Sequence, residues 1–300
     1  MFTSLPNIPI QEIKSELFTK NKVQLFIKRE DLIHTEISGN KWRKLKYNIN
    51  EYYAKGCHSV VTFGGAYSNH IAATSAAGAM LGIPTFGIIR GEEVVNETLT
   101  RAAENGMKFC FVSREEFKLK EQGEIAANFI QSLDKPFVIP EGGANLNGLQ
   151  GCAEILEGVD FDVVVLACGT GNTISGIISS LKKNQKAIGI PVLKGADFLV
   201  DDVQRNLREL NSDNTNWNLK LDYHFGGYAK YKVDLIDFIK KFYQDFQIKL
   251  DPVYTGKAMF ALFDLIQKGE IHDRKIIFVH TGGIQGVKGF EQRHGLKIFE

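Results

Sequence analysis

The sequence predicts an α/β fold built on mainly parallel sheets. Short β-branched runs alternate with helical patterns along the chain, which is typical of strand–helix–strand units. Several of these runs are almost continuously apolar, as strands are when helices cover both faces of a sheet. Glycine-rich turns follow three of them, at the strand ends where such sheets bind ligands. These turns are Gly64–Gly65, Gly169–Thr170–Gly171 and Gly282–Gly283.

Each expected element rests on its own pattern. The candidate strands are Val23–Arg29, Ser59–Phe63, Thr85–Arg90, Lys108–Val112, Phe137–Pro140, Val163–Cys168 and Ile276–His280. The candidate helices are Lys44–Tyr53, Ile71–Leu81, Glu97–Glu104, Glu124–Leu133, Ile174–Lys182, Val233–Phe246 and Met259–Ile266. The first helix places Leu45, Ile49 and Tyr52 on one face, and the second, rich in alanine, stops at a glycine and a proline.

Composition narrows the class of protein. The chain has 300 residues, of which 44% are hydrophobic and 24% charged, as in an ordinary globular protein of roughly two domains. A net charge of +1 gives no strong field toward nucleic acid or an anionic membrane, so we expect neither as a partner. No apolar run approaches the ~20 residues that span a bilayer. Met1–Ile10 lacks the basic and apolar regions of a signal peptide.

The cysteines and histidines suggest no metal site. The cysteines are far apart and form no C-x-x-C pair, which argues against a zinc ribbon or a redox motif. We expect them to be reduced core thiols in a cytoplasmic protein. They are Cys57, Cys110, Cys152 and Cys168. The seven histidines are dispersed, without an H-E-x-x-H pattern.

Lys41 is the first candidate for chemistry. It follows Ser38, Gly39 and Asn40 at the start of a predicted helix. The positive end of the helix dipole and desolvation both lower the pKa of such an amine, as a nucleophilic lysine requires. The alternative interpretation is a solvated basic face made of Lys41, Arg43, Lys44 and Lys46.

Two glycine-rich turns are candidate binding loops. After Gly64–Gly65, Tyr67, Ser68, Asn69 and His70 open a helix whose unpaired amides suit a substrate carboxylate, although Ser68 or Asn69 can equally be a plain N-cap. Gly169 to Thr173 lies between a strand and a helix, where backbone amides and threonine hydroxyls suit a phosphate. This turn lacks the patterns of nucleotide and dinucleotide sites, so a cofactor monophosphate fits best, and a simple tight turn is the alternative.

Two further segments complete the set. Tyr254-Thr255-Gly256-Lys257 opens the helix from Met259, and His280-Thr281-Gly282-Gly283 follows the last strand. Each alone can be a buried tyrosine or a glycine turn. In this order, from about Leu25 to Gly283, the five segments resemble fold-type II pyridoxal 5'-phosphate (PLP) enzymes. Within that class they resemble the family of 1-aminocyclopropane-1-carboxylate (ACC) deaminase and D-cysteine desulfhydrase.

The resemblance implies a fold and a cofactor. The fold is similar to the β subunit of tryptophan synthase: two open-sheet α/β domains with PLP in the cleft between them. It implies a large PLP-binding domain from residues 1–50 and 144–300, a small α/β domain from residues 51–143, and a homodimer. This chain departs from the family pattern at Ser38, which replaces a glycine, at Tyr67, which replaces a glutamine, and at the apolar Ile71–Ala73.

The resemblance also assigns roles to residues. The G-N-K-x-R-K-L, G-G-x-x-S-N and Y-[ET]-G-K motifs of the family make Lys41, Ser68 and Tyr254 the catalytic candidates, with Lys41 carrying the cofactor. The expected cofactor-binding residues are Lys41, Asn40, Cys168, Gly169, Thr170, Gly171, Asn172, Thr173, Thr255 and Thr281. The expected substrate-binding residues are Ser68, Asn69, His70, Tyr67 and Tyr254.

Thr255 bears on the choice of reaction. ACC deaminases have glutamate at the matching position, near the pyridine nitrogen, and desulfhydrase-like members have threonine. A hydroxyl supplies no charge to balance a pyridinium, so we expect an unprotonated ring, which suits elimination of a good leaving group. The first expectation is D-cysteine α,β-elimination to pyruvate, ammonia and sulfide. The alternatives are ACC deamination to 2-oxobutanoate and ammonia and, less favoured by an intact Lys41, a non-catalytic amino-acid-binding relative.

Overall fold

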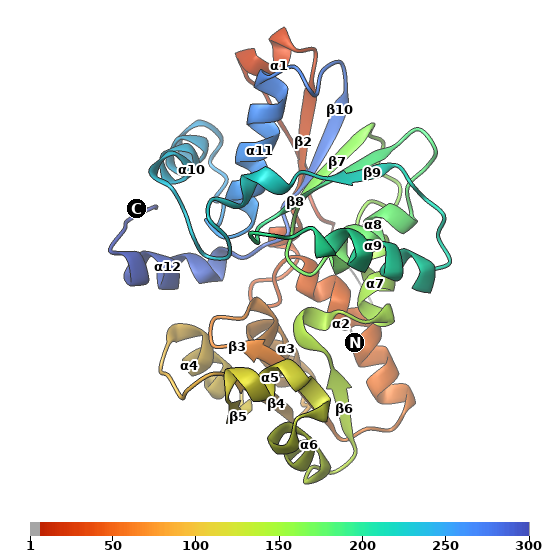
Figure 1. The fold of residues 1–300 in the computed structure, drawn as a ribbon, viewed down its shortest axis with the longest axis vertical. Helices are drawn as coiled ribbons and strands as arrows, with labels where there is room; N and C mark the ends of the chain where they lie inside the picture. Colours follow the sequence, from red (N-terminus) through yellow and green to blue (C-terminus); the bar gives the residue numbers. More distant parts are fainter. Residues whose placement is uncertain (1–6, 300) are drawn as a thin grey trace.

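The computed structural model describes residues 7–299, and its strands form two sheets (Figure 1). The larger sheet has the order β1-β2-β10-β7-β8-β9, in which β1 is antiparallel to β2 and the other pairs are parallel. Its strands are β1 (Ile10–Ile13), β2 (Gln24–Lys28), β7 (Val163–Cys168), β8 (Lys186–Pro191), β9 (Trp217–Leu219) and β10 (Lys275–Val279). Of the segment Met1–Ile10, the first six residues lie outside the described part.

The smaller sheet has the order β5-β4-β3-β6, with every pair parallel. Its strands are β3 (Ser59–Gly65), β4 (Thr85–Arg90), β5 (Lys108–Val112) and β6 (Pro136–Ile139). The prediction of an α/β fold with mainly parallel sheets is therefore confirmed, and all the candidate strands are present with small shifts at their ends.

Helices cover both faces of each sheet. The helices are α1 (Glu16–Lys20), α2 (Asn40–Ala54), α3 (Asn69–Leu81), α4 (Glu97–Glu104), α5 (Arg114–Leu119), α6 (Glu124–Gln131), α7 (Leu146–Ala153), α8 (Asn172–Ser179), α9 (Phe198–Glu209), α10 (Val233–Phe246), α11 (Thr255–Gln267) and α12 (Val287–His294). Apolar residues of α10 and α11 pack on one face of the large sheet, and those of α7, α8 and α9 on the other. Figure 1 shows α2 and α7 where the two sheets meet.

Two elements that lack a sequence pattern are formed by packing. Helix α7 contains Gly148 and Gly151, which are poor helix formers. A Cβ at Gly151 would lie 1.9 Å from the Arg43 carbonyl oxygen of α2, so glycine allows two helices to approach closely. Strand β8 contains Gly189, whose Cβ would lie 2.7 Å from Cys168 Sγ on the neighbouring β7. Tertiary contacts therefore fix residues that local propensity disfavours.

The two sheets divide the chain near the predicted domain limits. All strands of the small sheet fall within residues 51–143, while residue 50 lies inside α2. Separate folding of the two ranges stays a prediction. No helix in residues 7–299 is long and apolar enough to cross a membrane. Within the same range the cysteines form no disulfide, and Cys152 and Cys168 are buried while Cys57 and Cys110 are partly exposed.

Candidate active site

Asn40 joins three of the motif segments at the start of α2. Its backbone N–H donates to Thr281 O at 3.3 Å, and its Nδ2 donates to Thr173 Oγ1 at 2.8 Å. The preceding Gly39 has φ of 66°, and a Cβ there would lie 1.9 Å from Thr281 O. Only glycine allows this approach. The Lys41 segment, the Gly169–Thr173 turn and the Thr281 loop are therefore packed together.

Lys41 lies in the first turn of α2 and reaches the loop after β6. Its Nζ is 3.5 Å from Gly142 O, and the Nζ of Lys44 donates to the same oxygen at 3.0 Å. Burial, and then the charge of Lys44, lower the pKa of Lys41 to about 7. A large share of this amine is therefore neutral near pH 7, as a nucleophile requires. A solvated basic face is the wrong interpretation, since Lys44 and Arg43 are buried and Arg43 forms a bidentate pair with Glu30.

Ser68 and His70 form the start of α3 beside Lys41. Ser68 is the N-cap, and its Oγ accepts from the backbone N–H groups of His70 and Ile71 at 3.2 and 3.3 Å. The capping interpretation is thus correct, and it leaves the Ser68 proton available to a ligand. His70 is buried, and neither of its ring nitrogens has a hydrogen-bond partner among the described residues. Burial, Lys41 and Lys44 lower the pKa of His70 well below its usual value, so the ring is neutral.

The turn after β7 has the geometry of an anion site. Gly171 is the N-cap of α8 and has φ of 72°. The first backbone N–H groups of the helix have no helical carbonyl to donate to, so they are available to an anion. Asn172 is buried, and its Oδ1 has no partner among residues 7–299. Thr173 Oγ1 accepts from Asn40, and the Thr173 side chain is also hydrogen-bonded to Cys152. Thr170 is exposed at the tip of the turn.

The Cys168 thiol lies apart from this turn. The side chain belongs to the apolar cluster between the large sheet and helices α8 and α9. Burial raises the pKa of its thiol to about 12, so it stays protonated and unreactive. Of the residues expected at the cofactor, Cys168 can therefore contribute only its backbone.

Thr255 lies against a buried carboxylate. Its Oγ1 donates to Asp251 Oδ1 at 2.7 Å and accepts from Asp251 N at 2.9 Å. Asp251 also accepts from the backbone N–H groups of Val253, Tyr254 and Thr255 at 2.8 to 2.9 Å. Thr255 therefore lies beside a carboxylate that no sequence pattern predicted, while the protonation state of the ring stays a prediction. The single proton of its hydroxyl is already donated within the protein.

The 281–283 loop connects Asp251 to the start of α3. A Cβ at Gly283 would lie 3.1 Å from Asp251 Cγ and 3.5 Å from Asn69 Nδ2. Thr281 is partly exposed, and its hydroxyl has no hydrogen-bond partner among the described residues. Of the two threonines expected near the ring, Thr281 therefore has the uncommitted hydroxyl.

Tyr254 extends over the phosphate turn. A Cβ at Gly169 would lie 3.2 Å from Tyr254 Cε1. Burial, followed by the neighbouring phenol of Tyr228, raises the pKa of Tyr254 well above its usual value, so this phenol keeps its proton. The two rings meet edge to face with centroids 6.0 Å apart. The structure thus brings Lys41, Ser68, Tyr254 and the phosphate turn into one region.

Tyr67 points toward α12. Its side chain is 52% exposed, and the ring lies 3.6 Å from the position of a Cβ on Gly289. It lines a groove of about 360 Å³ with residues around the start of α4, with Gln285 before α12 and with residues of α12 as far as Arg293 in its last turn. An effect of Tyr67 on substrate choice stays a prediction.

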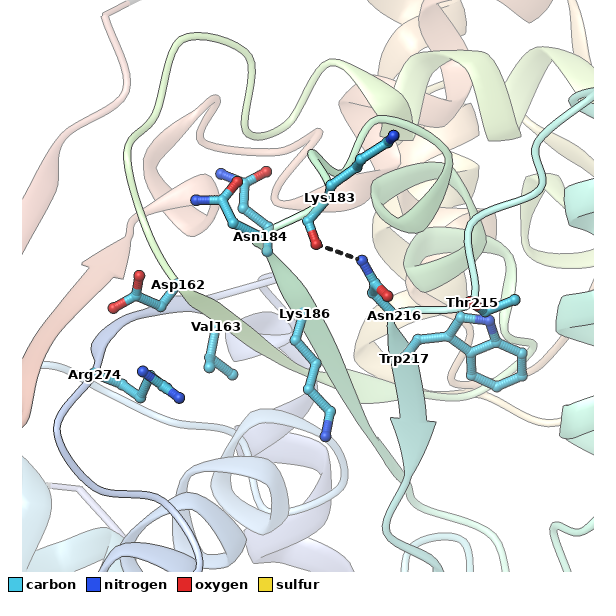
Figure 2. A pocket seen from close by; sticks show the side chains of 10 residues that line it. Asp162, Val163, Lys183, Asn184, Lys186, Thr215, Asn216, Trp217 and Arg274 are labelled. Carbon is cyan, nitrogen blue, oxygen red and sulfur yellow. Dashed lines mark hydrogen bonds between the residues drawn. The ribbon is translucent and has the colours of Figure 1, made fainter.

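A second, larger cavity is remote from this region. It is a concavity of about 610 Å³ lined by residues that precede or begin β7, β8, β9 and β10, and Figure 2 shows their side chains. Its labelled residues are Asp162, Val163, Lys183, Asn184, Lys186, Thr215, Asn216, Trp217 and Arg274. None of them belongs to the five motif segments; those after β3, β7 and β10 lie at the opposite, carboxyl ends of strands, and Tyr254–Lys257 opens α11.

Sequence reasoning missed three parts of the site. The loop Glu141–Gly143 after β6 carries the same double glycine as the loop after β3, so it was visible as a turn of the same kind. Tyr228 follows Gly226–Gly227 in a stretch without helical or strand periodicity, which hid it. Asp251 precedes a proline outside any predicted element, and only the fold places it under Thr255.

The fold and these residues define a class of protein. Loops at the carboxyl ends of parallel strands gather a partly neutral lysine, an amide-lined turn and buried polar atoms without partners. This is the arrangement of a fold-type II enzyme that holds a phosphorylated aldehyde cofactor on a lysine.

Comparisons with known proteins agree. The family described as pyridoxal-phosphate dependent enzyme matches residues 5–282. A putative ACC deaminase of Pyrococcus furiosus is 34% identical over 281 residues, covering 87% of this chain and 85% of that protein. The bifunctional D-cysteine desulfhydrase/ACC deaminase of Arabidopsis thaliana is 31% identical over 89% of this chain and 74% of its own length. The crystal structure of an ACC deaminase homologue superposes with a TM-score of 0.86 at 32% identity, covering 96% of this chain and 93% of the other.

The chain therefore belongs to the pyridoxal-phosphate dependent enzymes. The predictions of a fold-type II PLP enzyme and of PLP as the cofactor are confirmed. The residues present fit the group, since Asn172 Oδ1 and the two His70 ring nitrogens are buried polar atoms that need partners.

Proposed function

We propose that this enzyme breaks down a small amino acid on PLP attached to Lys41, and that its first substrate is D-cysteine, which yields pyruvate, ammonia and sulfide. The carrying observation is the partly neutral Lys41 amine at the meeting point of the motif loops. Relatives whose names include D-cysteine desulfhydrase support the choice of substrate.

In this proposal the amides of Gly169–Thr173 and the hydroxyl of Thr173 hold the cofactor phosphate. Thr281 would be the threonine available to hold the pyridine nitrogen, because the Thr255 proton is already donated to Asp251. When bound, the cofactor withdraws electrons from the substrate Cα.

The remaining residues act on the substrate. Lys41 Nζ accepts the Cα proton, which its lowered pKa permits. Ser68 donates its hydroxyl proton to the substrate carboxylate while its oxygen caps α3. Tyr254 keeps its phenolic proton at neutral pH and can donate it to the departing sulfur.

ACC deamination is the second candidate. The observation that favours it is the Asp251 carboxylate, whose Oδ1 lies 2.7 Å from Thr255 Oγ1. If Thr255 contacts the pyridine ring, this negative charge stabilises the protonated form of the ring. Relatives named as ACC deaminases support the same candidate. Thr255 and Thr281 favour the desulfhydrase reaction. The Asp251 carboxylate favours ACC deamination, so it reduces the expected preference for D-cysteine.

Keto-acid release decides between them. We expect a higher kcat/KM for D-cysteine than for ACC or L-cysteine, and no release with Lys41→Ala, the control for cofactor chemistry in solution. A clear preference for ACC would select the second candidate. Release from neither substrate would end both assignments and leave the cofactor assignment standing. A homodimer and a cytoplasmic location stay predictions.

A further inference from the structure

Lys257 is a buried lysine without a role in the proposed chemistry. It is fully shielded from solvent in the first turn of α11, three residues after Tyr254. Burying an ammonium group is costly unless hydrogen bonds replace its water. Burial lowers the pKa of Lys257 to about 8, and Asp251 acts in the opposite direction. A methionine would fill the same space without that cost, so the amine needs a specific reason.

The amine holds two carbonyl groups of one loop. Lys257 Nζ donates to His224 O at 2.9 Å and to Gly227 O at 2.8 Å. Each carbonyl has a second donor, since His224 O also accepts from Gly227 N and Gly227 O from Lys230 N. Gly227 immediately precedes Tyr228 in the chain, and His224 lies four residues before it.

The backbone of this loop adopts a conformation that local preference does not favour. Phe225 and Ala229 have φ of 54°, and Gly226 and Gly227 have φ of 96° and 119°. Left-handed non-glycine residues are strained and persist where surrounding contacts fix them. Lys257 supplies two such contacts. The ring of Phe225 supplies another against Phe260, one turn further along α11, with centroids 5.0 Å apart.

The same helix therefore holds both tyrosines of the site. Tyr254 is the N-cap of this helix. Lys257 and Phe260, further along it, contact the loop that carries Tyr228. Tyr228 is 48% exposed, and its side chain meets Tyr254 through edge-to-face packing and a hydrogen bond between the two side chains. We propose that Lys257 is a positioning residue that sets Tyr228 against Tyr254 through the His224 and Gly227 carbonyls. The link to turnover rests on the proposed role of Tyr254.

The test compares Lys257→Met, Tyr228→Phe and the double variant in the holoenzyme. Misplacing a reacting group by about 1 Å can cost up to roughly 100-fold, so Lys257→Met should lower kcat/KM for D-cysteine by roughly 10- to 100-fold. If Lys257 acts through Tyr228, the double variant should be no worse than the more impaired single variant. Lys268→Met, which removes an exposed lysine from the end of the same helix, is the matched control and should keep full activity. Multiplying losses in the double variant would overturn the proposal.

A spectroscopic arm does not depend on turnover. With 3-fluorotyrosine at position 228, the ¹⁹F resonance should be a single sharp line in the parent protein. It should shift or broaden in Lys257→Met and stay unchanged in Lys268→Met. If Lys257→Met does not fold, Gly227→Ala replaces it, because φ of 119° must change for alanine while its Cβ meets nothing closer than 3.5 Å. An unchanged ¹⁹F line in the folded variant would refute the proposal even if neither substrate reacts.

Discussion

The starts of α2 and α11 each place a buried lysine beside a motif, and they use it differently. Lys41, in α2, has a single carbonyl at 3.5 Å and a pKa of about 7. Lys257, in α11, has two carbonyls within 2.9 Å and a pKa of about 8. Burial is the main cause of both shifts. Hydrogen bonding, more than pKa, separates an amine that can react from one that anchors a loop.

The contrast extends to the polar groups around each lysine. At the α11 start Asp251 accepts three amides and the Thr255 hydroxyl, so these groups are satisfied internally. Beside α2, His70 and Asn172 are buried with atoms that have no partner among the described residues. Buried polar groups without partners are rare in folded proteins, so such groups mark where a ligand belongs. The region beside α2 thus leaves buried polar atoms without partners in residues 7–299, whereas the α11 start satisfies the polar groups around Asp251 internally.

The largest effect should come from Lys41→Ala. Loss of a positioned group for proton transfer costs roughly 10²- to 10⁴-fold, and here the cofactor attachment is lost as well. Keto-acid release should fall at least that far while circular dichroism stays unchanged. Lys46→Ala is the matched control, since Lys46 lies on the same helix and pairs with Glu154. If Lys41→Ala kept activity within tenfold of the parent, Lys41 would not be the reactive lysine, and the contrast with Lys257 would fail.

The pKa of Lys41 should govern cofactor loading. Attachment needs the neutral amine, so the loading rate of the apoprotein should rise about tenfold per pH unit below 7 and level off above it. The unfolded chain keeps this proton up to about its usual pKa of 10.5, so the same group makes the apoprotein more stable as pH rises from 7 toward 10.5. Stopped-flow absorbance after mixing with PLP measures the rate. A rate still rising at pH 9 would show an unshifted lysine.

Ser68→Ala should separate capping from substrate binding at the α3 start. Both functions are lost, so we expect about 1 kcal/mol of stability and roughly 10- to 100-fold of kcat/KM to disappear, with the PLP spectrum kept. Ser113→Ala removes an equivalent N-cap from α5, whose Oγ accepts from Glu116 N, and should cost stability alone. Equal activity in the two variants would reduce Ser68 to a helix cap.

Gly171→Ala should give the smallest effect. A left-handed alanine strains the turn, and its Cβ would lie 3.2 Å from Val203 Cγ2. Loss of about one hydrogen bond to a phosphate weakens PLP binding roughly tenfold. Gly158→Ala is the control, because Gly158 has the same φ of 72° with nothing within 4 Å. PLP titration of both apoproteins should show weaker binding in Gly171→Ala only.

Sequence patterns predicted the strands, most long helices and the five motif loops, because apolar periodicity and glycine turns are local. They did not predict α7, whose glycines serve a contact with α2 from far along the chain. Nor did they place Asp251 under Thr255 or the Lys257 amine on the Tyr228 loop. The Lys257 contacts depend on backbone geometry at Phe225–Gly227, which no local pattern encodes. The sequence patterns located the loops of the candidate site, and the contacts that hold those loops in place became visible only in the fold.

One measurement tests the difference between the two lysines most directly. Borohydride reduction of the holoenzyme makes the bond between the cofactor and its lysine permanent. Peptide mapping then identifies the labelled lysine. The account predicts a pyridoxyl label on Lys41 alone. A label on Lys257, or on Lys44 beside Gly142 O, would contradict it, because an amine held by carbonyl groups would then be the reactive one.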